Sequence, residues 1–307
     1  MKRALMALMI PLAMILLTGC EATELGRRAI IQAAAVDYAD GEYTVSALMF
    51  SSGGGSGEID AADENVIKVT GKGATFPAAL DDISLIDGKD IFFNENKLLV
   101  IGGGFSGADL TPVLEVLVRE LRCSLNMLVC SSDDPDLLTD LHFTEGITSA
   151  EKPVSMIENA YRAGISPKTC LLDLLNGTAA GKSVLLPQFV YSENGYGMTP
   201  DEYGATAVLN GSRVFSEGKL GRRLDTVETT GAMLLAGDTD STQLAFFHGG
   251  KEVSCEAYDI RMKRLPDGNI SLSARLRRRN GEALPKELRS AAMEELNYLI
   301  TAALDAE

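Results

Sequence analysis

The residues that most resemble a site for chemistry lie between Gly102 and Gly107, where Gly-Gly-Gly-Phe-Ser-Gly satisfies the pattern G-x-G-x-x-G. In dinucleotide-binding folds this loop opens a helix, and the first N–H groups of that helix bind the pyrophosphate. Here Thr111 and Pro112 are the natural cap and first residue of the next helix. That helix is expected to begin several residues after Gly107. The pattern therefore favours a structural turn over the alternative of an NAD enzyme.

Two other patterns with catalytic potential are incomplete. Residues 176–183, NGTAAGKS, imitate a phosphate-binding loop but have three residues between the glycines, where the motif has four. Residues 104–108 miss the G-x-S-x-G nucleophile turn by one position. No spacing assigns a Ser/His/Asp or paired-carboxylate arrangement. We therefore expect no catalytic residue and no bound cofactor.

The cysteines and histidines give no pattern typical of a metal site. Four cysteines lie beyond residue 20: Cys123, Cys130, Cys170 and Cys255. Their even number permits two disulfides outside the cytoplasm, but their spacing resembles neither a disulfide framework nor a C-x-x-C site. We expect most of them to be reduced and packed. Neither of the two histidines, His142 and His248, is near a cysteine pair, so a zinc site is not expected.

Cys20 is the one residue with a specific predicted modification. Residues 1–19 have a basic start at Lys2 and Arg3 and an apolar run, which is typical of a signal peptide and short for a transmembrane helix. Leu17-Thr18-Gly19-Cys20 looks like a bacterial lipobox, in which the cysteine receives a diacylglycerol and becomes the new N-terminus. This predicts a lipid anchor that holds the chain at a membrane. A cleaved signal peptide followed by a chance cysteine stays open as the alternative.

The charge of the chain argues against nucleic acid as a partner. The net charge is −15, and loss of Lys2 and Arg3 with the signal peptide makes the mature chain more acidic still. An acidic protein is repelled by anionic headgroups, so we expect the lipid, and not charge, to hold it at a membrane. The basic run 275–279 is best interpreted as the solvated end of a strand.

The order of expected elements favours an α+β fold over a doubly wound sheet, because strands and helices are mixed without a regular βαβ repeat. Hydrophobic periodicity and turn signals predict strands over 29–36, 43–50, 66–69, 97–101, 125–130, 184–191, 205–209, 213–215, 243–247, 252–262 and 270–276. They predict helices over 75–85, 112–121, 135–143, 152–163, 167–176, 225–235 and 285–303. Asp40-Gly41 and Asn210-Gly211 are expected to be hairpin turns.

With these elements in order, the sequence resembles the Ger(x)C family, the lipoprotein C subunits of bacterial spore germinant receptors. The lipobox is followed by Glu24-Leu25 and an early apolar strand, and KLLVIGG precedes a short turn, a helix and a strand, as in the family. The most specific part is a succession of short motifs. They are carried here by Leu186-Pro187, Gly204-Ala205, Leu220-Gly221, Glu228-Thr229 and Gly231. The sequence departs from the family pattern in two ways. No Trp follows Cys20, and the sequence stops at Glu307, within or just after a helix that is followed by more strand and helix in the family.

The resemblance implies a three-domain α+β lipoprotein without enzymatic activity, on the outer face of the spore's inner membrane. The expected divisions are a signal peptide at 1–19, domain I at 20–183, domain II at 184–249 and a shortened domain III at 250–307. The implied partners are two integral membrane subunits, of A type and B type, with which the chain supports receptor assembly and signal coupling in germination. The alternative from another class is a solute-binding lipoprotein of a transporter.

Overall fold

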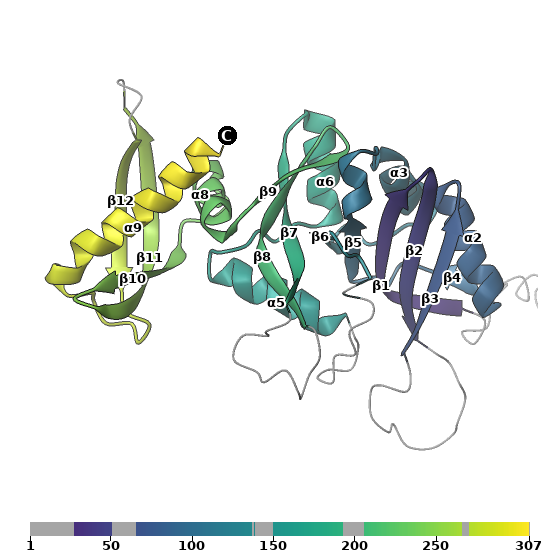
Figure 1. Cartoon of the computed structure of the whole chain (residues 1–307), viewed down its shortest axis with the longest axis horizontal. Coiled ribbons are helices and arrows are strands. Elements are labelled where there is room, and N and C mark those ends of the chain that lie inside the picture. Colours follow the sequence, from purple (N-terminus) through teal and green to yellow (C-terminus); the bar gives the residue numbers. More distant parts are fainter. Residues whose placement is uncertain are drawn as a thin grey trace, which may run out of the picture.

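The computed structural model describes residues 28–50, 66–136, 138, 150–192, 206–265 and 270–306. The molecule is elongated, with a large sheet that occupies more than half of its length and a small sheet at the other end (Figure 1). Cys20, the signal peptide, Gly204-Ala205 and most of the predicted helix 135–143 lie outside the described residues. The mixture of strands and helices confirms the predicted α+β class.

The large sheet has nine strands in the order β3-β2-β1-β5-β6-β7-β8-β9, with β4 paired to the start of β1. Its strands are β1 (Arg28–Ala39), β2 (Glu42–Phe50), β3 (Val66–Gly73), β4 (Asp90–Phe92), β5 (Leu98–Gly102), β6 (Leu128–Ser132), β7 (Val184–Ser192), β8 (Thr206–Ser216) and β9 (Lys219–Leu224). β1, β5, β6 and β7 are parallel neighbours, and the flanking pairs are antiparallel. The carboxyl ends of the four parallel strands therefore meet at one edge of the sheet.

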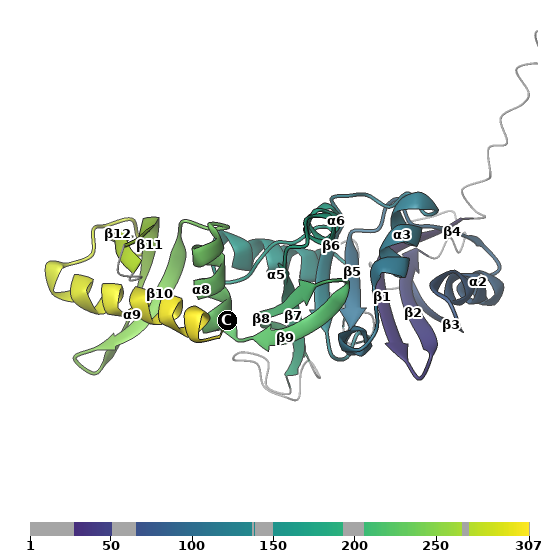
Figure 2. The same cartoon turned by 90° about the horizontal axis from the view of Figure 1, so that it is seen from above.

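Helices cover both faces of this sheet, as seen from above in Figure 2. The helices are α2 (Phe76–Asp87), the 3-10 turn η2 (Gly103–Ser106), α3 (Thr111–Arg119), α5 (Glu151–Arg162) and α6 (Leu171–Ala180). The buried side chains of α2, α3 and α6 share one core with one face of the sheet. Ile157 of α5 belongs to a second core on the opposite face. The central strand β5 is buried along its whole length, as expected for a parallel strand between two layers.

The C-terminal unit is a three-stranded antiparallel sheet with two helices. It contains α8 (Thr226–Ala236), β10 (Thr242–His248), β11 (Lys251–Arg264), β12 (Ile270–Arg277) and α9 (Lys286–Asp305). Its core gathers apolar side chains of the three strands with those of α9 and the end of α8. On α9, Ala292, Leu296 and Leu299 are buried in this core.

Local signals predicted several boundaries correctly. Asp40 and Gly41 both have positive φ, at 53° and 84°, and join β1 to β2 as an antiparallel hairpin. Asp225 caps α8 through a reciprocal capping box with Glu228, and Gly237 ends the helix in the left-handed conformation.

Three local predictions were wrong. Asn210-Gly211 is not a hairpin turn, because β8 runs through it and turns into β9 at Glu217-Gly218, both with positive φ. α6 begins at Leu171, because Cys170 is extended and its N–H donates to Asp173, and the helix continues past Gly177 to Ala180. Thr111 is inside α3 instead of capping it, since its own N–H donates to the carboxylate of Asp109.

The large sheet continues across the expected division between domains I and II. β6 comes before residue 183 and β7 comes after it, yet the two strands pair with each other. Their pairing consists of Ser131↔Gln188 and Ser132↔Phe189. The limits of the three domains stay a prediction. Within the described ranges, no helix combines the length and the apolar character that crossing a bilayer requires.

Candidate functional site: the joint between the two sheets

The glycine loop is closed by a carboxylate of the chain itself. One carboxylate oxygen of Asp37, near the end of β1, accepts hydrogen bonds from the N–H of Gly104 and from the N–H of Tyr38, both at 2.9 Å. A side chain at Gly102 would overlap the Asp37 carboxyl group. The position that a phosphate would take in a dinucleotide site is therefore held by a negative group.

The backbone after the loop also differs from a dinucleotide site. Gly103–Ser106 form the short η2 turn, and α3 begins only at Thr111. At Gly104 a Cβ would come within 1.9 Å of the carbonyl oxygen of Tyr38, so glycine is required there by backbone contact. At Gly107, by contrast, a Cβ would meet nothing within 4 Å. The prediction of a structural turn agrees with this geometry.

Beside the loop, Asp133 joins the end of β6 to the β8–β9 hairpin. Its two carboxylate oxygens accept from the guanidinium groups of Arg213, at 2.7 Å, and Arg223, at 2.6 Å. The Arg213 Nε also donates to the carbonyl of Gly221 at 3.0 Å, within the Leu220-Gly221 motif. These two ion pairs occupy both carboxylate oxygens of Asp133 and fix the hairpin against the parallel strands.

The motif around Glu228 forms the first contact between the large sheet and the C-terminal unit. The Thr229 hydroxyl lies 2.8 Å from the Ser212 hydroxyl of β8, and both residues are fully buried. A Cβ at Gly211 would come within 2.0 Å of the Leu224 carbonyl oxygen, so this glycine allows β8 to approach the start of α8. The two residues of this hydroxyl pair satisfy each other in an interior where an unpaired group would be costly.

Gly231, on the same helix, makes a contact inside the C-terminal unit. Its absent side chain leaves room for the Leu299 carbonyl oxygen of α9, which would be 2.0 Å from a Cβ. α8 and α9 therefore cross at backbone contact. The three residues of this motif, which carried the family resemblance, have separate structural roles. Glu228 takes part in the cap of α8, the Thr229 hydroxyl belongs to a buried hydrogen bond, and Gly231 lets α9 cross α8 closely.

A second contact connects the end of α5 to the beginning of β10. The Gln243 N–H donates to the Ala163 carbonyl, and the Thr242 hydroxyl donates to the Gly164 carbonyl, both at 3.0 Å. Gly164 has a φ of 68°, and a Cβ there would lie 2.0 Å from the Ser241 carbonyl. Among the described residues, hydrogen bonds thus hold the C-terminal unit to the large sheet at two separate places.

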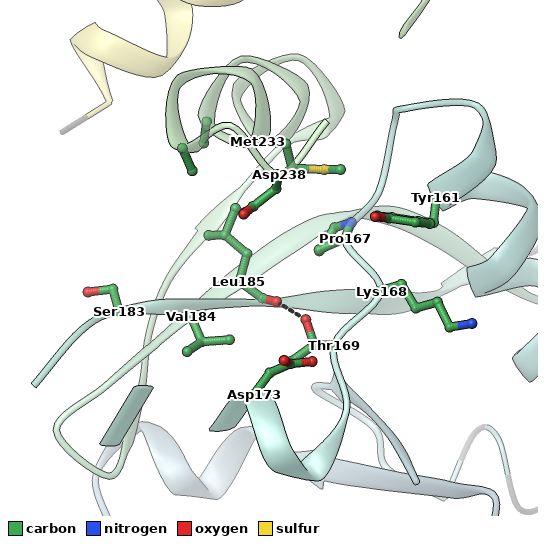
Figure 3. Close-up of a pocket in the computed structure, with 12 residues that line it drawn as sticks. Tyr161, Pro167, Lys168, Thr169, Asp173, Ser183, Val184, Leu185, Met233 and Asp238 are labelled. Atoms are coloured by element: carbon green, nitrogen blue, oxygen red, sulfur yellow. Dashed lines mark hydrogen bonds between the residues drawn. The ribbon is translucent and has the colours of Figure 1, made fainter. Parts of the chain in front are cut away.

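Between the two contacts lies a hollow of about 410 Å³ (Figure 3). Met233 and Asp238 line it from the C-terminal unit, while Tyr161, Pro167 and Asp173 line it from the large-sheet side. Burial raises the pKa of the Asp238 carboxyl, and the neighbouring charge of Asp173 raises it further. A second hollow, of about 420 Å³, shares Ser183, Leu185, Ala232 and Ala236 with the first and has Arg222 and Glu228 in its lining. The joint is therefore hollowed on the described surface, and the first hollow has the carboxylates of Asp173 and Asp238 in its lining.

The four described cysteines are free thiols. Cys123, Cys130 and Cys255 are buried, and Cys170 is half-buried at the start of α6. Burial raises the pKa of Cys123 to about 12 and raises the pKa of the other three thiols as well. These thiols are in their unreactive, protonated form at neutral pH. Across the described residues, no group of three or more His, Cys, Asp or Glu side chains is arranged to hold a metal ion.

Comparison with known proteins identifies the family. A family model described as "Spore germination protein N-terminal domain" matches residues 21–191, which is more than half of the chain. The chain belongs to this family of spore germination proteins. The match confirms the resemblance to the Ger(x)C germinant-receptor subunits that the sequence motifs suggested.

Two further comparisons add little. A search of curated proteins finds no match to the chain. A solved structure, "Crystal Structure of the GerBC protein", is similar over 89% of this chain and 79% of that chain, with 15% identity and a TM-score of 0.47.

Sequence reasoning missed the groups that close the glycine loop and the joint. Asp37 follows a long apolar run, and Asp133 follows the buried strand β6. A polar residue directly after a buried parallel strand is a signal that could have placed both at one edge of the sheet. The contact of Gly164 with Ser241 has no comparable local signal, because 77 positions of chain separate the two residues.

Proposed function

We propose that this chain is the non-enzymatic lipoprotein subunit of a nutrient germinant receptor, anchored by a lipid on Cys20 to the outer face of the membrane. The observation that carries the proposal is the family match, which begins at residue 21, directly after the lipobox cysteine. The Asp37 carboxylate argues against a nucleotide bound at the glycine loop, because it already accepts the Gly104 N–H.

Its role in the receptor is assembly and signal coupling beside the two integral membrane subunits, of A type and B type. A lipid anchor raises the local concentration of the chain at membrane partners without requiring a tight interface. The joint between the two sheets supports the coupling role, since it gives the C-terminal unit two small contacts and two hollows through which a change of angle can be transmitted.

The experiment compares Cys20→Ala with Cys170→Ala in sporulating cells. Cys20→Ala is expected to abolish incorporation of labelled fatty acid, to remove the chain from purified spore membranes, and to reduce recovery of the two membrane subunits in a pull-down. Cys170→Ala controls for the loss of a thiol elsewhere. Normal receptor assembly and germination in Cys20→Ala would contradict the coupling role, and a lack of acylation in the wild type would contradict the anchor.

A solute-binding lipoprotein of a transporter is the second candidate, favoured by the hollow between Asp173, Asp238 and Tyr161. A ligand of that hollow, present at 100 times its dissociation constant, would stabilise the protein by about 2.7 kcal/mol. Thermal unfolding in the presence of small nutrients measures this gain. A shift that disappears in Asp238→Asn would favour this candidate, together with recovery of transporter components in the pull-down.

A further inference from the structure

Two large aliphatic side chains are strongly exposed at one end of the molecule. Leu85 is 82% exposed and Ile86 is 60% exposed on the last turn of α2. The core-facing stripe of this helix runs through Phe76, Ala79, Leu80 and Ile83, which are all buried. Leu85 and Ile86 fall outside the stripe, so packing among the described residues does not account for their apolar character.

The described chain begins beside this turn. Arg28, the first residue of β1, pairs in register with Asp90 of β4, which follows Ile86 by four residues. The Arg28 guanidinium lies 5.2 Å from the centre of the Phe92 ring. β4 and α2 occupy the same end of the molecule, opposite to β10 and α9 (Figures 1 and 2).

The covalent chain limits how far this end can be from a membrane anchor. Cys20 and Arg28 are eight residues apart, and eight residues span at most about 28 Å when fully extended. An anchor at Cys20 therefore keeps the α2–β4 end within that distance of the bilayer, while the opposite end carries no such restriction.

We propose that Leu85 and Ile86 insert into the bilayer surface and set the orientation of the protein on it. This proposal rests on the proposed anchor at Cys20. The occupant is a lipid surface and not a protein, because the tether brings this end to the lipid in every copy of the chain. Burial of the two side chains removes them from water, which is the driving force for an interfacial contact.

Charge does not drive this contact. Asp81 and Asp90 are exposed close to the pair, and the Lys89 ammonium lies 3.8 Å from a carboxylate oxygen of Asp87. Acidic groups therefore outnumber basic ones beside the pair, and anionic headgroups do not attract this end. The contact is expected to depend on the two aliphatic side chains and not to weaken as the salt concentration rises.

The chain has no tryptophan, so a single introduced tryptophan reports on its own surroundings. The experiment uses the full lipidated chain carrying Leu85→Trp, reconstituted in vesicles of phosphatidylglycerol and phosphatidylethanolamine with brominated acyl chains. Phe247→Trp is the matched control, because Phe247 is 77% exposed on β10 at the opposite end. Flotation of the vesicles establishes anchoring for each variant.

We expect the Leu85→Trp emission to move to shorter wavelength and to be quenched by bromine placed about 5–10 Å below the headgroups. The Phe247→Trp emission is expected to be the same with and without brominated lipid. Flotation without quenching of Leu85→Trp would overturn the inserted orientation while leaving the anchor intact. Equal quenching of both variants would overturn it too, and a short-wavelength emission without quenching would assign this surface to a protein contact. Failure of the wild type to float would overturn the anchor and the inference together.

Discussion

Gly104 and Gly231 perform similar tasks in the two parts of the molecule, but only the first looks like a ligand site in the sequence. Gly104 lets η2 approach β1, where the Gly104 N–H donates to Asp37 and the Tyr38 carbonyl oxygen lies where a Gly104 side chain would be. Gly231 lets α9 approach α8. Both are places where a backbone carbonyl occupies the space of a side chain. A glycine pattern therefore identifies a close backbone approach. Whether a ligand can bind at a glycine loop depends on which group already accepts the N–H groups of that loop.

The largest expected effect separates two glycines of the same loop. Gly104→Ala places a methyl group at 1.9 Å from the Tyr38 carbonyl oxygen, so the loop must move and lose its bond to Asp37. We expect a loss of about 3 kcal/mol in the free energy of unfolding, measured by urea denaturation. Gly107→Ala is the control and should change little, because its Cβ meets nothing within 4 Å. Equal losses for both variants would indicate that the loop has a role beyond close packing.

Within the C-terminal unit, Gly231→Ala is expected to cost about 2 kcal/mol in the free energy of unfolding, although alanine is a better helix former than glycine by roughly 1 kcal/mol. The reason is the Leu299 carbonyl oxygen, 2.0 Å from the new Cβ. Hydrogen exchange locates the damage. Amides of α9 should exchange faster, while those of β5 keep their protection. Faster exchange in β5 would mean that the two parts unfold as one unit, and would break the comparison.

A smaller effect is expected at the ion pair of the large sheet. Asp133→Asn weakens two bonds to Arg213 and Arg223, but Asp133 is 51% exposed and solvent screens its charge. We expect about 1 kcal/mol or less in urea denaturation, decreasing in high salt. Asp134→Asn is the neighbouring control, since it is the backbone carbonyl of Asp134 that accepts from Ser132. A loss that is independent of salt would argue against an electrostatic cause.

The smallest effect is a pH dependence in the C-terminal unit. A bidentate hydrogen bond from Arg277, at 2.7 Å and 2.8 Å, lowers the pKa of Glu256 below its ordinary value of 4.5. The stabilisation is therefore present above that value and is lost as the pH falls through the lowered pKa. Wild type and Glu256→Gln should differ in unfolding free energy at neutral pH and converge in acid. A constant difference across this range would show that packing, and not charge, is lost.

Elements with local signals were predictable from the sequence. The Asp40-Gly41 hairpin and the two ends of α8 are determined by residues within a few positions of one another. Asn210-Gly211 failed as a hairpin signal because the requirement at Gly211 comes from Leu224, which is brought there by β9. α6 was placed too early because the segment before it pairs with β6, through Leu128↔Cys170 and the bond from Val129 to Thr169.

The joint could be predicted only in part. Glu228-Thr229 and Gly231 were identified by resemblance, but their partners Ser212 and Leu299 come from elements that lie on either side of α8 in sequence. The sequence shows which residues are unusual. It does not show which distant backbone they contact, because that contact exists only once two sheets have formed.

The narrow pairing of β6 with β7 has a mechanical consequence. β1–β2 and β7–β8 are long ladders, whereas β6 and β7 share two register pairs, strengthened by the Ser131–Gln188 hydrogen bond of 2.6 Å. The ion pairs of Asp133 cross the same seam. Tension applied across the large sheet, between the α2–β4 end and the β8–β9 hairpin, would meet long ladders on each side and only two register pairs between β6 and β7. Such tension within the large sheet would therefore concentrate its strain along this seam.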